Sequence, residues 1–238
     1  MPIARCHERQ LTFLLSCIRE WTIRMGGKVL TIKTAPACYH PLTHEICHRS
    51  YLAAGFSPNH TYSNHYIPIT DQRFDQVIEP AERRRLAKGK NSGLRIALEP
   101  GICDETTEAM LCACDRAHGR QLRIKPGEIA RIMRAVPESY ITLTATNGEQ
   151  ILAGALFVRV SDRVLYHFLS GFFPEFRAIS PSLLLFDAAY QYCLDNGLQI
   201  LDLGISLDHL GHEKTSLASF KRRIGGQECP KIIYEATF

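Results

Sequence analysis

Alternating apolar and polar residues, broken by turn signals, dominate residues 140–172 of this 238-residue chain. The segments YITLTAT (140–146) and ILAGALFVRV (151–160) flank Asn147-Gly148, a dipeptide that favours a tight type I′ turn between antiparallel strands. A third segment, VLYHFLSGF (164–172), follows directly. The three segments predict an antiparallel meander, so the chain is expected to form a mostly antiparallel sheet. In the third strand, one face is expected to carry Val164, Tyr166 and Phe168, and the other Leu165, His167 and Leu169.

A helix is predicted directly after the meander, in ISPSLLLFDAAYQYCLDNG (179–197). Ser180 is expected to be its N-cap, Pro181 suits the first helical position, and Gly197 ends it. After it come a strand in QILDLGI (199–205), a short helix in SLASFKRR (216–223) and a last strand in KIIYEAT (231–237). The buried stripe of the long helix is expected to consist of Leu183, Phe186, Tyr190 and Cys193, opposite Asp187, Gln191 and Asp195.

Upstream of residue 139, helical and strand-like patterns alternate without an internal repeat or a low-complexity linker. One helical segment contains Pro80, at which a bend is expected. The predicted helices are 10–25, 42–55, 73–89, 104–118 and 126–136, and the predicted strands are 28–33, 61–69 and 94–99.

The composition predicts a soluble globular protein of the cytoplasm. The net charge of +4 is too small to indicate non-specific nucleic-acid binding. The nine cysteines are an odd number in a chain without a convincing export signal, which favours free thiols in a reducing compartment. No apolar stretch approaches the roughly 20 residues of a membrane span.

The segment CYHPLTHEICH (38–48) raises the question of a metal site. His44 and His48 are four residues apart and would share one face of a helix, which leaves a two-histidine metal clasp open. Structural zinc sites, however, usually consist of two separated ligand pairs. We therefore expect an ordinary helix surface and no metal.

The element order after residue 139 resembles that of the GNAT superfamily of acyltransferases. The motifs LYHFLSGF, ISPSLLL, LDLGIS and FKRRIGG resemble those of the FemABX aminoacyltransferases and the related polysaccharide-linked acetyltransferase-like domains. The resemblance implies an α+β fold of GNAT type, with a mixed, mostly antiparallel sheet flanked by helices and a partial second GNAT-like unit at the N-terminus. The implied domains are residues 1–100 as that partial unit, 101–138 as a helical connection and 139–238 as the acyltransferase domain.

The upstream half departs from the family. The first domain of the family normally begins with several strands before the helix at 10–25, and this chain starts too late to contain them. We therefore expect either a short relative or a clipped reading frame. The acceptor-binding role of the family's early first-domain residues is not carried over.

The resemblance places a donor-phosphate site at the start of the helix after the meander, because the exposed N–H groups and the helix dipole favour anions there. The GNAT pattern at this point is Arg or Gln, two residues, Gly, one residue, and Gly or Ala. Arg177, Ser180 and Ser182 occupy these positions, so serines replace both glycines. Pro181 also removes one N–H from the phosphate cradle. An ordinary capped helix is the alternative.

The Fem-type enzymes carry a Phe-Lys pair in the last helix, which lines the donor channel, and Phe220 and Lys221 match it. Tyr166 lies on the strand that lines the cleft in relatives, and His209, in a polar loop, has the near-neutral pKa that suits a general base. The alternatives are a solvated basic helix end for Lys221, a core tyrosine for Tyr166 and a solubilising loop residue for His209.

These residues imply an N-acyltransferase that moves an acetyl or aminoacyl group directly to a primary amine without a metal. The donor is expected to be acyl-CoA or aminoacyl-tRNA, with acyl-CoA preferred. A tRNA partner is expected only if the donor is aminoacyl-tRNA. The acceptor is expected to be a small-molecule or cell-wall or polysaccharide amine. The alternative is a catalytically silent GNAT-like binding protein in an envelope or polysaccharide pathway.

Overall fold

The computed structural model describes residues 8–101, 105–119, 127–208 and 210–238. The described chain forms two compact units, one made of residues 8–64 with Glu228–Phe238 and the other of His65–Gln227. The predicted division at residues 100 and 138 refers to the tandem arrangement of the family and stays a prediction, as does the partial GNAT-like unit at the N-terminus.

The first unit is built from two helices, one whole strand and parts of two others. The elements are α1 (Glu8–Arg24), β1 (Val29–Lys33), a 3-10 turn (Ala37–Tyr39), α2 (Pro41–Ala53), the start of β2 (Ser57–Pro68) and most of β8 (Gln227–Thr237). Strand β1 pairs antiparallel with β8, from Val29 opposite Thr237 to Lys33 opposite Ile233. The buried core of this unit consists of Leu15, Ala54, Phe56, Ile232, Tyr234 and Ala236.

The second unit contains the predicted meander and the helices around it. Its helices are α3 (Phe74–Val77), α4 (Pro80–Lys90), α5 (Glu105–Ala117), α6 (Glu128–Ala135), α7 (Pro181–Asp195) and α8 (Thr215–Arg223). Its strands are β3 (Arg95–Pro100), β4 (Tyr140–Thr146), β5 (Ile151–Arg159), β6 (Val164–Phe172) and β7 (Ile200–Ile205). Two 3-10 turns, Pro137–Ser139 and Pro174–Ile179, precede β4 and α7.

The described strands form a mixed, mostly antiparallel sheet in the order β1-β8-β2-β7-β6-β5-β4-β3. The β3–β4, β4–β5 and β5–β6 pairs are antiparallel, whereas β6 and β7 run parallel. The predicted α+β fold class is therefore confirmed. No helix in the described parts of the chain combines the length and the apolar character needed to cross a bilayer.

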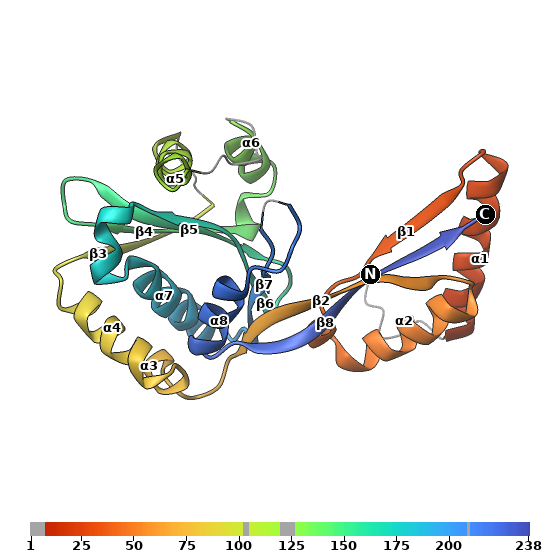
Figure 1. Cartoon of the computed structure of the whole chain (residues 1–238), viewed down its shortest axis with the longest axis horizontal. Coiled ribbons are helices and arrows are strands. Elements are labelled where there is room, and N and C mark those ends of the chain that lie inside the picture. The colour runs from red at the N-terminus through yellow and green to blue at the C-terminus, as the bar shows by residue number, and fades with distance from the viewer. Residues whose placement is uncertain (1–7, 102–104, 120–126, 209) are drawn as a thin grey trace. The chain divides into compact units, whose positions relative to one another are not determined.

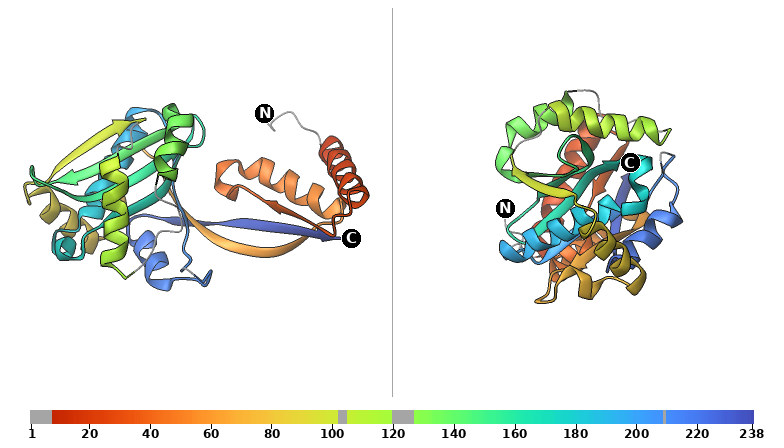
Figure 2. Two further views of the ribbon diagram at one scale, coloured as in Figure 1. Left: turned by 90° about the horizontal axis from the view of Figure 1, so that it is seen from above. Right: turned by 90° about the vertical axis from the view of Figure 1, so that its left-hand side faces the viewer.

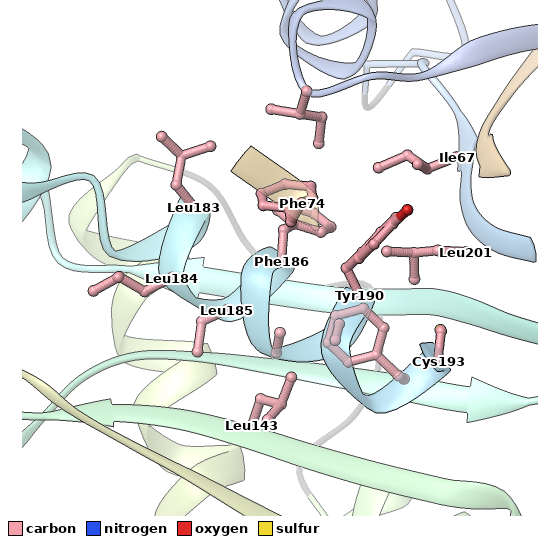
Figure 3. Packing of buried hydrophobic residues seen from close by; sticks show 14 of the residues in the cluster. Ile67, Phe74, Leu143, Leu183, Leu184, Leu185, Phe186, Tyr190, Cys193 and Leu201 are labelled. Carbon is pink, nitrogen blue, oxygen red and sulfur yellow. The ribbon is translucent and has the colours of Figure 1, made fainter. Parts of the chain in front are cut away.

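Helices cover both faces of the sheet in the second unit (Figures 1 and 2). Helix α7 packs on one face and is itself contacted by α3 and α4, while α5, with α6 beside it, packs on the opposite face. Because α7 touches both the sheet and two helices, its apolar surface is broad. Figure 3 shows part of its packing, with Tyr190 and Phe74 among the buried side chains. The predicted stripe of Leu183, Phe186, Tyr190 and Cys193 is confirmed, and Leu184, Leu185 and Ala189 are buried as well.

The predicted single helix at 73–89 is two helices. Ile78 and Glu79 adopt extended backbone with ψ of 156° and 151°, and Pro80 opens α4 at its first position. A proline at the start of a helix sacrifices no intrahelical hydrogen bond, which is why a break is favoured over a bend.

The loop between β4 and β5 is not the predicted type I′ turn. Thr146 pairs with Ile151, so residues 147–150 form a four-residue loop. Gly148 has φ of 96°, whereas among the described non-glycine residues only Ser180 has a positive φ, so Asn147 does not meet the type I′ requirement. The Asn147 Oδ1 atom instead accepts hydrogen bonds from the N–H groups of Glu149 and Gln150, both at 3.0 Å.

Strand β6 also departs from simple alternation. Leu156 lies opposite Leu169 and Phe157 opposite His167, so Phe168 is the extra residue of a β-bulge. Phe168 and Leu169 consequently both pack against the cluster beneath α5, whereas Leu165 belongs to the cluster beneath α7. The prediction that Leu165 and Leu169 share a face is wrong, because the bulge shifts the alternation by one residue.

Candidate functional site

The parallel strands β6 and β7 pair over a short distance and then separate. Their register comprises Val164 with Ile200, Leu165 with Leu201, and Tyr166 with Asp202. Both strands continue beyond the last pair, β6 to Phe172 and β7 to Ile205. Backbone groups in these continuing segments are thus not used for pairing between the two strands. We call this region, residues 166–172 of β6 and 202–205 of β7, the strand wedge.

Lys221 bonds to the β7 part of the strand wedge. Although it lies in the last turn of α8, its exposed fraction is only 5%. Its Nζ donates hydrogen bonds to the carbonyl oxygens of Gly204, at 3.0 Å, and Ile205, at 2.8 Å. The side chain therefore satisfies two carbonyls just beyond the last β6–β7 pair. The alternative of a solvated helix end does not describe Lys221.

The two glycines after α8 permit this placement. Gly225 adopts φ of 88°, and a Cβ atom on it would lie 3.0 Å from the carbonyl oxygen of Val77. A Cβ atom on Gly226 would lie 2.5 Å from the carbonyl oxygen of Lys221 itself, closer than real contacts allow. The Gly-Gly turn thus lets the chain reverse tightly against the end of α8.

Burial and a buried carboxylate act on Lys221 in opposite directions. Burial lowers the pKa of Lys221 from 10.5 to about 8, because a desolvated ammonium is disfavoured, and nearby Asp202 partly counteracts this effect. Asp202 is 1% exposed and accepts a hydrogen bond from the Gly204 N–H at 2.8 Å. Asp202 therefore fixes the backbone of Gly204, whose carbonyl oxygen accepts one of the Lys221 hydrogen bonds.

Tyr166 lies beside the same glycine. A Cβ atom on Gly204, which has φ of 73°, would be 3.3 Å from the Tyr166 ring, so the absence of a side chain admits the tyrosine. Burial raises the pKa of Tyr166, and the charge of Asp202 raises it further. The hydroxyl therefore keeps its proton at neutral pH.

His167 is the first β6 residue beyond the last pair, and the sequence reasoning did not select it. Its ring lies 5.3 Å from that of Phe157 and 5.0 Å from that of Phe186, measured between centroids. Burial, followed by the positive charge of Lys221, lowers the pKa of His167 to about 3, so the imidazole is neutral. The available signal was a histidine within an apolar strand segment, which by itself is more typical of a core position.

The start of α7 keeps an unusual backbone conformation. Ser180 occupies the N-cap position, but its side chain forms no cap hydrogen bond, contrary to the prediction. Its φ of 49° and ψ of 56° are left-handed, the conformation that favours glycine. Arg177 is exposed in the preceding 3-10 turn, and Ser182 is half-buried in the first turn of α7.

Aromatic contacts link the start of α7 to the end of α8. The Phe220 ring lies 6.1 Å from that of Phe186, which is one helical turn beyond Ser182. The structure thus brings Tyr166, Phe220 and Lys221 into one neighbourhood. Arg177 lies instead in the 3-10 turn before α7, and His209 lies outside the described residues.

Two further features involve no residue of the strand wedge. A surface pocket of about 430 Å³ is lined by residues of α3, α4, β3 and α7. In the first unit, His48 Nδ1 and the Tyr234 hydroxyl are hydrogen-bonded at 2.5 Å. Across the described ranges, no group of three or more His, Cys, Asp or Glu side chains is arranged to hold a metal ion.

Comparison with known proteins identifies the family of the chain. Residues 81–222, more than half of the chain, match the family model described as the acetyltransferase (GNAT) domain. No curated protein matches the sequence significantly.

Several solved structures share the fold. The crystal structure of FemX superimposes with a TM-score of 0.76 at 13% identity, covering 97% of this chain and 77% of that one. The C-terminal domain of a putative lysylphosphatidylglycerol synthetase from Agrobacterium fabrum gives a TM-score of 0.67 at 15% identity, covering 94% and 72%. L-PGS from Bacillus licheniformis gives 0.62 at 11% identity, covering 94% and 73%. At these identities the likeness shows the fold, while the family match covers the strand wedge and α8 up to Arg222. The chain therefore belongs to the acetyltransferase (GNAT) domain family and is an acyltransferase with a FemABX-like fold.

Proposed function

We propose that the strand wedge is the acyl-transfer site and that the protein transfers an acyl group from acyl-CoA to a primary amine. The observation that carries this proposal is the separation of β6 and β7 after Tyr166 and Asp202, with buried Lys221 bonded to the freed end of β7. A donor that is extended along β6 can bond to the backbone groups that β7 no longer pairs with.

Each step of the reaction has a candidate group. The neutral amine attacks the acyl carbon, the bond to the donor sulfur breaks, the amine loses a proton and the leaving thiolate takes one up. An ammonium at Lys221 would stabilise negative charge on the carbonyl oxygen. Tyr166, which keeps its proton at neutral pH, is suited to protonating the leaving group. His209 stays the proposed general base.

The donor phosphates are proposed to bind at the start of α7. Ser180 keeps the left-handed backbone for which the GNAT pattern uses glycine, and this supports a retained phosphate loop. Arg177 is exposed there and supplies positive charge, and the hydroxyls of Ser180 and Ser182 are possible phosphate donors. Phe220 would line the acyl channel through its contact with Phe186.

The remaining parts of the proposal concern the acceptor and the compartment. FemX among the structural neighbours supports a cell-wall or polysaccharide amine as acceptor. Aminoacyl-tRNA is the second donor candidate for the same reason. Cytoplasmic localisation and the division into residues 1–100, 101–138 and 139–238 complete the proposal.

Binding of acetyl-CoA tests the donor. At 100 times its dissociation constant, acetyl-CoA should stabilise the protein by about 2.7 kcal/mol, measured as a rise in melting temperature. Lys221→Met should remove this stabilisation, while Lys214→Met, at the exposed other end of α8, should not. Stabilisation by aminoacyl-tRNA alone would replace the proposed donor, and no stabilisation by either would contradict the proposed site.

A further inference from the structure

His167 combines a position at the opening of the strand wedge with an unmet hydrogen-bonding group. It directly follows Tyr166, whose pairing with Asp202 is the last between β6 and β7. Its Nε2 atom is buried, and no described residue supplies it with a hydrogen-bond partner. The residue as a whole is only partly buried.

A phenyl side chain would suit the surroundings of the His167 ring better than an imidazole does. Two phenyl rings, those of Phe157 and Phe186, flank the His167 ring. A buried polar atom without a partner destabilises the folded protein, whereas a phenylalanine would carry no such penalty. The environment therefore supplies no structural reason for a polar ring, and a ligand that bonds to Nε2 would remove the penalty.

Lys221 indicates which ligand group is suitable. Its ammonium has three N–H donors, and the Gly204 and Ile205 carbonyls account for two of them. Burial, and after it the charge of Lys221, lowers the pKa of His167 and keeps the imidazole neutral. In the tautomer that carries its proton on Nε2, His167 is a donor close to a cation. Two such donors match an oxygen on which negative charge develops.

We propose that His167 is a catalytic residue whose Nε2–H donates a hydrogen bond to the acyl carbonyl oxygen of the donor, alongside the ammonium of Lys221. This inference rests on the proposed function, because the oxygen belongs to the donor of that reaction. No covalent step involves His167. It stabilises the charge that appears on the oxygen when the amine attacks and that disappears when the bond to the leaving group breaks.

The test compares His167→Phe with His167→Gln and with a matched control. His167→Phe should lower kcat by about 10²-fold, as expected when one donor to a developing oxyanion is lost, and should leave KM within about 3-fold. His167→Gln, which keeps a side-chain N–H, should recover part of that loss. The control is His118→Phe, the same change at a histidine on the α5 side whose ring contacts Phe172.

Affinity and folding provide readouts besides turnover. The wild-type protein should bind acetyl-CoA more tightly than CoA, and His167→Phe should abolish this preference while keeping or raising the melting temperature. An unchanged kcat and an unchanged preference for acetyl-CoA over CoA in a folded His167→Phe variant would overturn the inference. This result is expected if a water molecule, and not the donor, bonds to Nε2. A wild-type protein that binds neither acetyl-CoA nor CoA would overturn the proposed donor, and the inference with it.

Discussion

Ser180 has the left-handed backbone conformation that glycine favours, although it is not a glycine. A left-handed conformation costs an L-residue roughly 1–2 kcal/mol, and the Ser180 side chain forms no cap hydrogen bond that would offset this cost. The strain lies at the start of α7, where the proposed donor phosphates bind. Strained backbone of this kind persists only where the surrounding structure holds it in place.

Replacing Ser180 with glycine should therefore stabilise the protein. Relief of the left-handed strain should outweigh the extra freedom of glycine in the unfolded chain, giving a gain of about 0.5–1 kcal/mol in the free energy of unfolding. Urea denaturation measures this change. The control is Ser182→Gly, within the first turn of α7, which should cost about 0.5 kcal/mol. A loss of stability in Ser180→Gly would contradict the strain.

Lys221 should give the protein a distinctive dependence of stability on pH. Its pKa is about 8 in the folded protein and 10.5 ordinarily, so between these pH values the unfolded chain binds more protons. Stability rises with pH wherever the unfolded state binds more protons. The penalty for the buried charge, roughly 3 kcal/mol, is thus fully present below pH 8 and is relieved as the pH rises towards 10.5.

The comparison with Lys221→Met isolates this effect from other titrating groups. The free energy of unfolding of the wild type, minus that of the variant, should increase between pH 8 and pH 10, measured by urea denaturation. Asp202 and His167, which interact with Lys221, and Tyr166, which interacts with Asp202, are present in both proteins, so their contributions largely cancel. A difference that stays constant or falls over this range would show that Lys221 is not a buried charge.

At the scale of elements, a buried carboxylate ties α4 to the end of α8. Glu82 is 1% exposed and accepts hydrogen bonds from Arg223 Nε at 2.8 Å and from Arg85 Nη1 at 3.2 Å. The Glu79 N–H donates to the Arg223 carbonyl at 2.9 Å. Helix α4 therefore holds the turn of α8 that carries Lys221.

Glu82→Gln should destabilise the protein and disturb the site. The loss of a buried charged acceptor should lower the free energy of unfolding by about 1–3 kcal/mol and also reduce turnover, because α8 is less firmly held. Arg85→Ala should cost less than about 1 kcal/mol, since the Arg85 side chain is 59% exposed. Denaturation and steady-state kinetics measure both variants. Equal losses in the two would show that the Arg223 contact has no special role.

The elements themselves could largely be predicted from the sequence. Helix α7 and strands β4, β5 and β6 were predicted nearly to their ends, because hydrophobic periodicity and the Ser-Pro and Gly signals act within a few residues. The four-residue loop found in place of the predicted type I′ turn, the bulge at Phe168 and the break before Pro80 were not predicted. The bulge depends on how β6 pairs with β5, which local patterns do not record.

At the scale of the whole molecule, the order of the elements was sufficient for the α+β class and the family resemblance. The choice of Phe220 and Lys221 came from the resemblance, and local periodicity left a solvated helix end open. Lys221 is buried because α8 approaches β7, and its two carbonyl acceptors lie 16 and 17 residues earlier in the chain.

By itself the sequence determined which segments become strands and helices, because that information is local. Tertiary structure decided where the pairing of β6 with β7 ends, that Lys221 bonds to the end of β7, and that no described residue pairs with the buried Nε2 of His167. The physical reason is that strand pairing and desolvation depend on residues that are distant in the chain. Tyr166 and Asp202, the last pair of the register, are separated along the chain by the whole of α7.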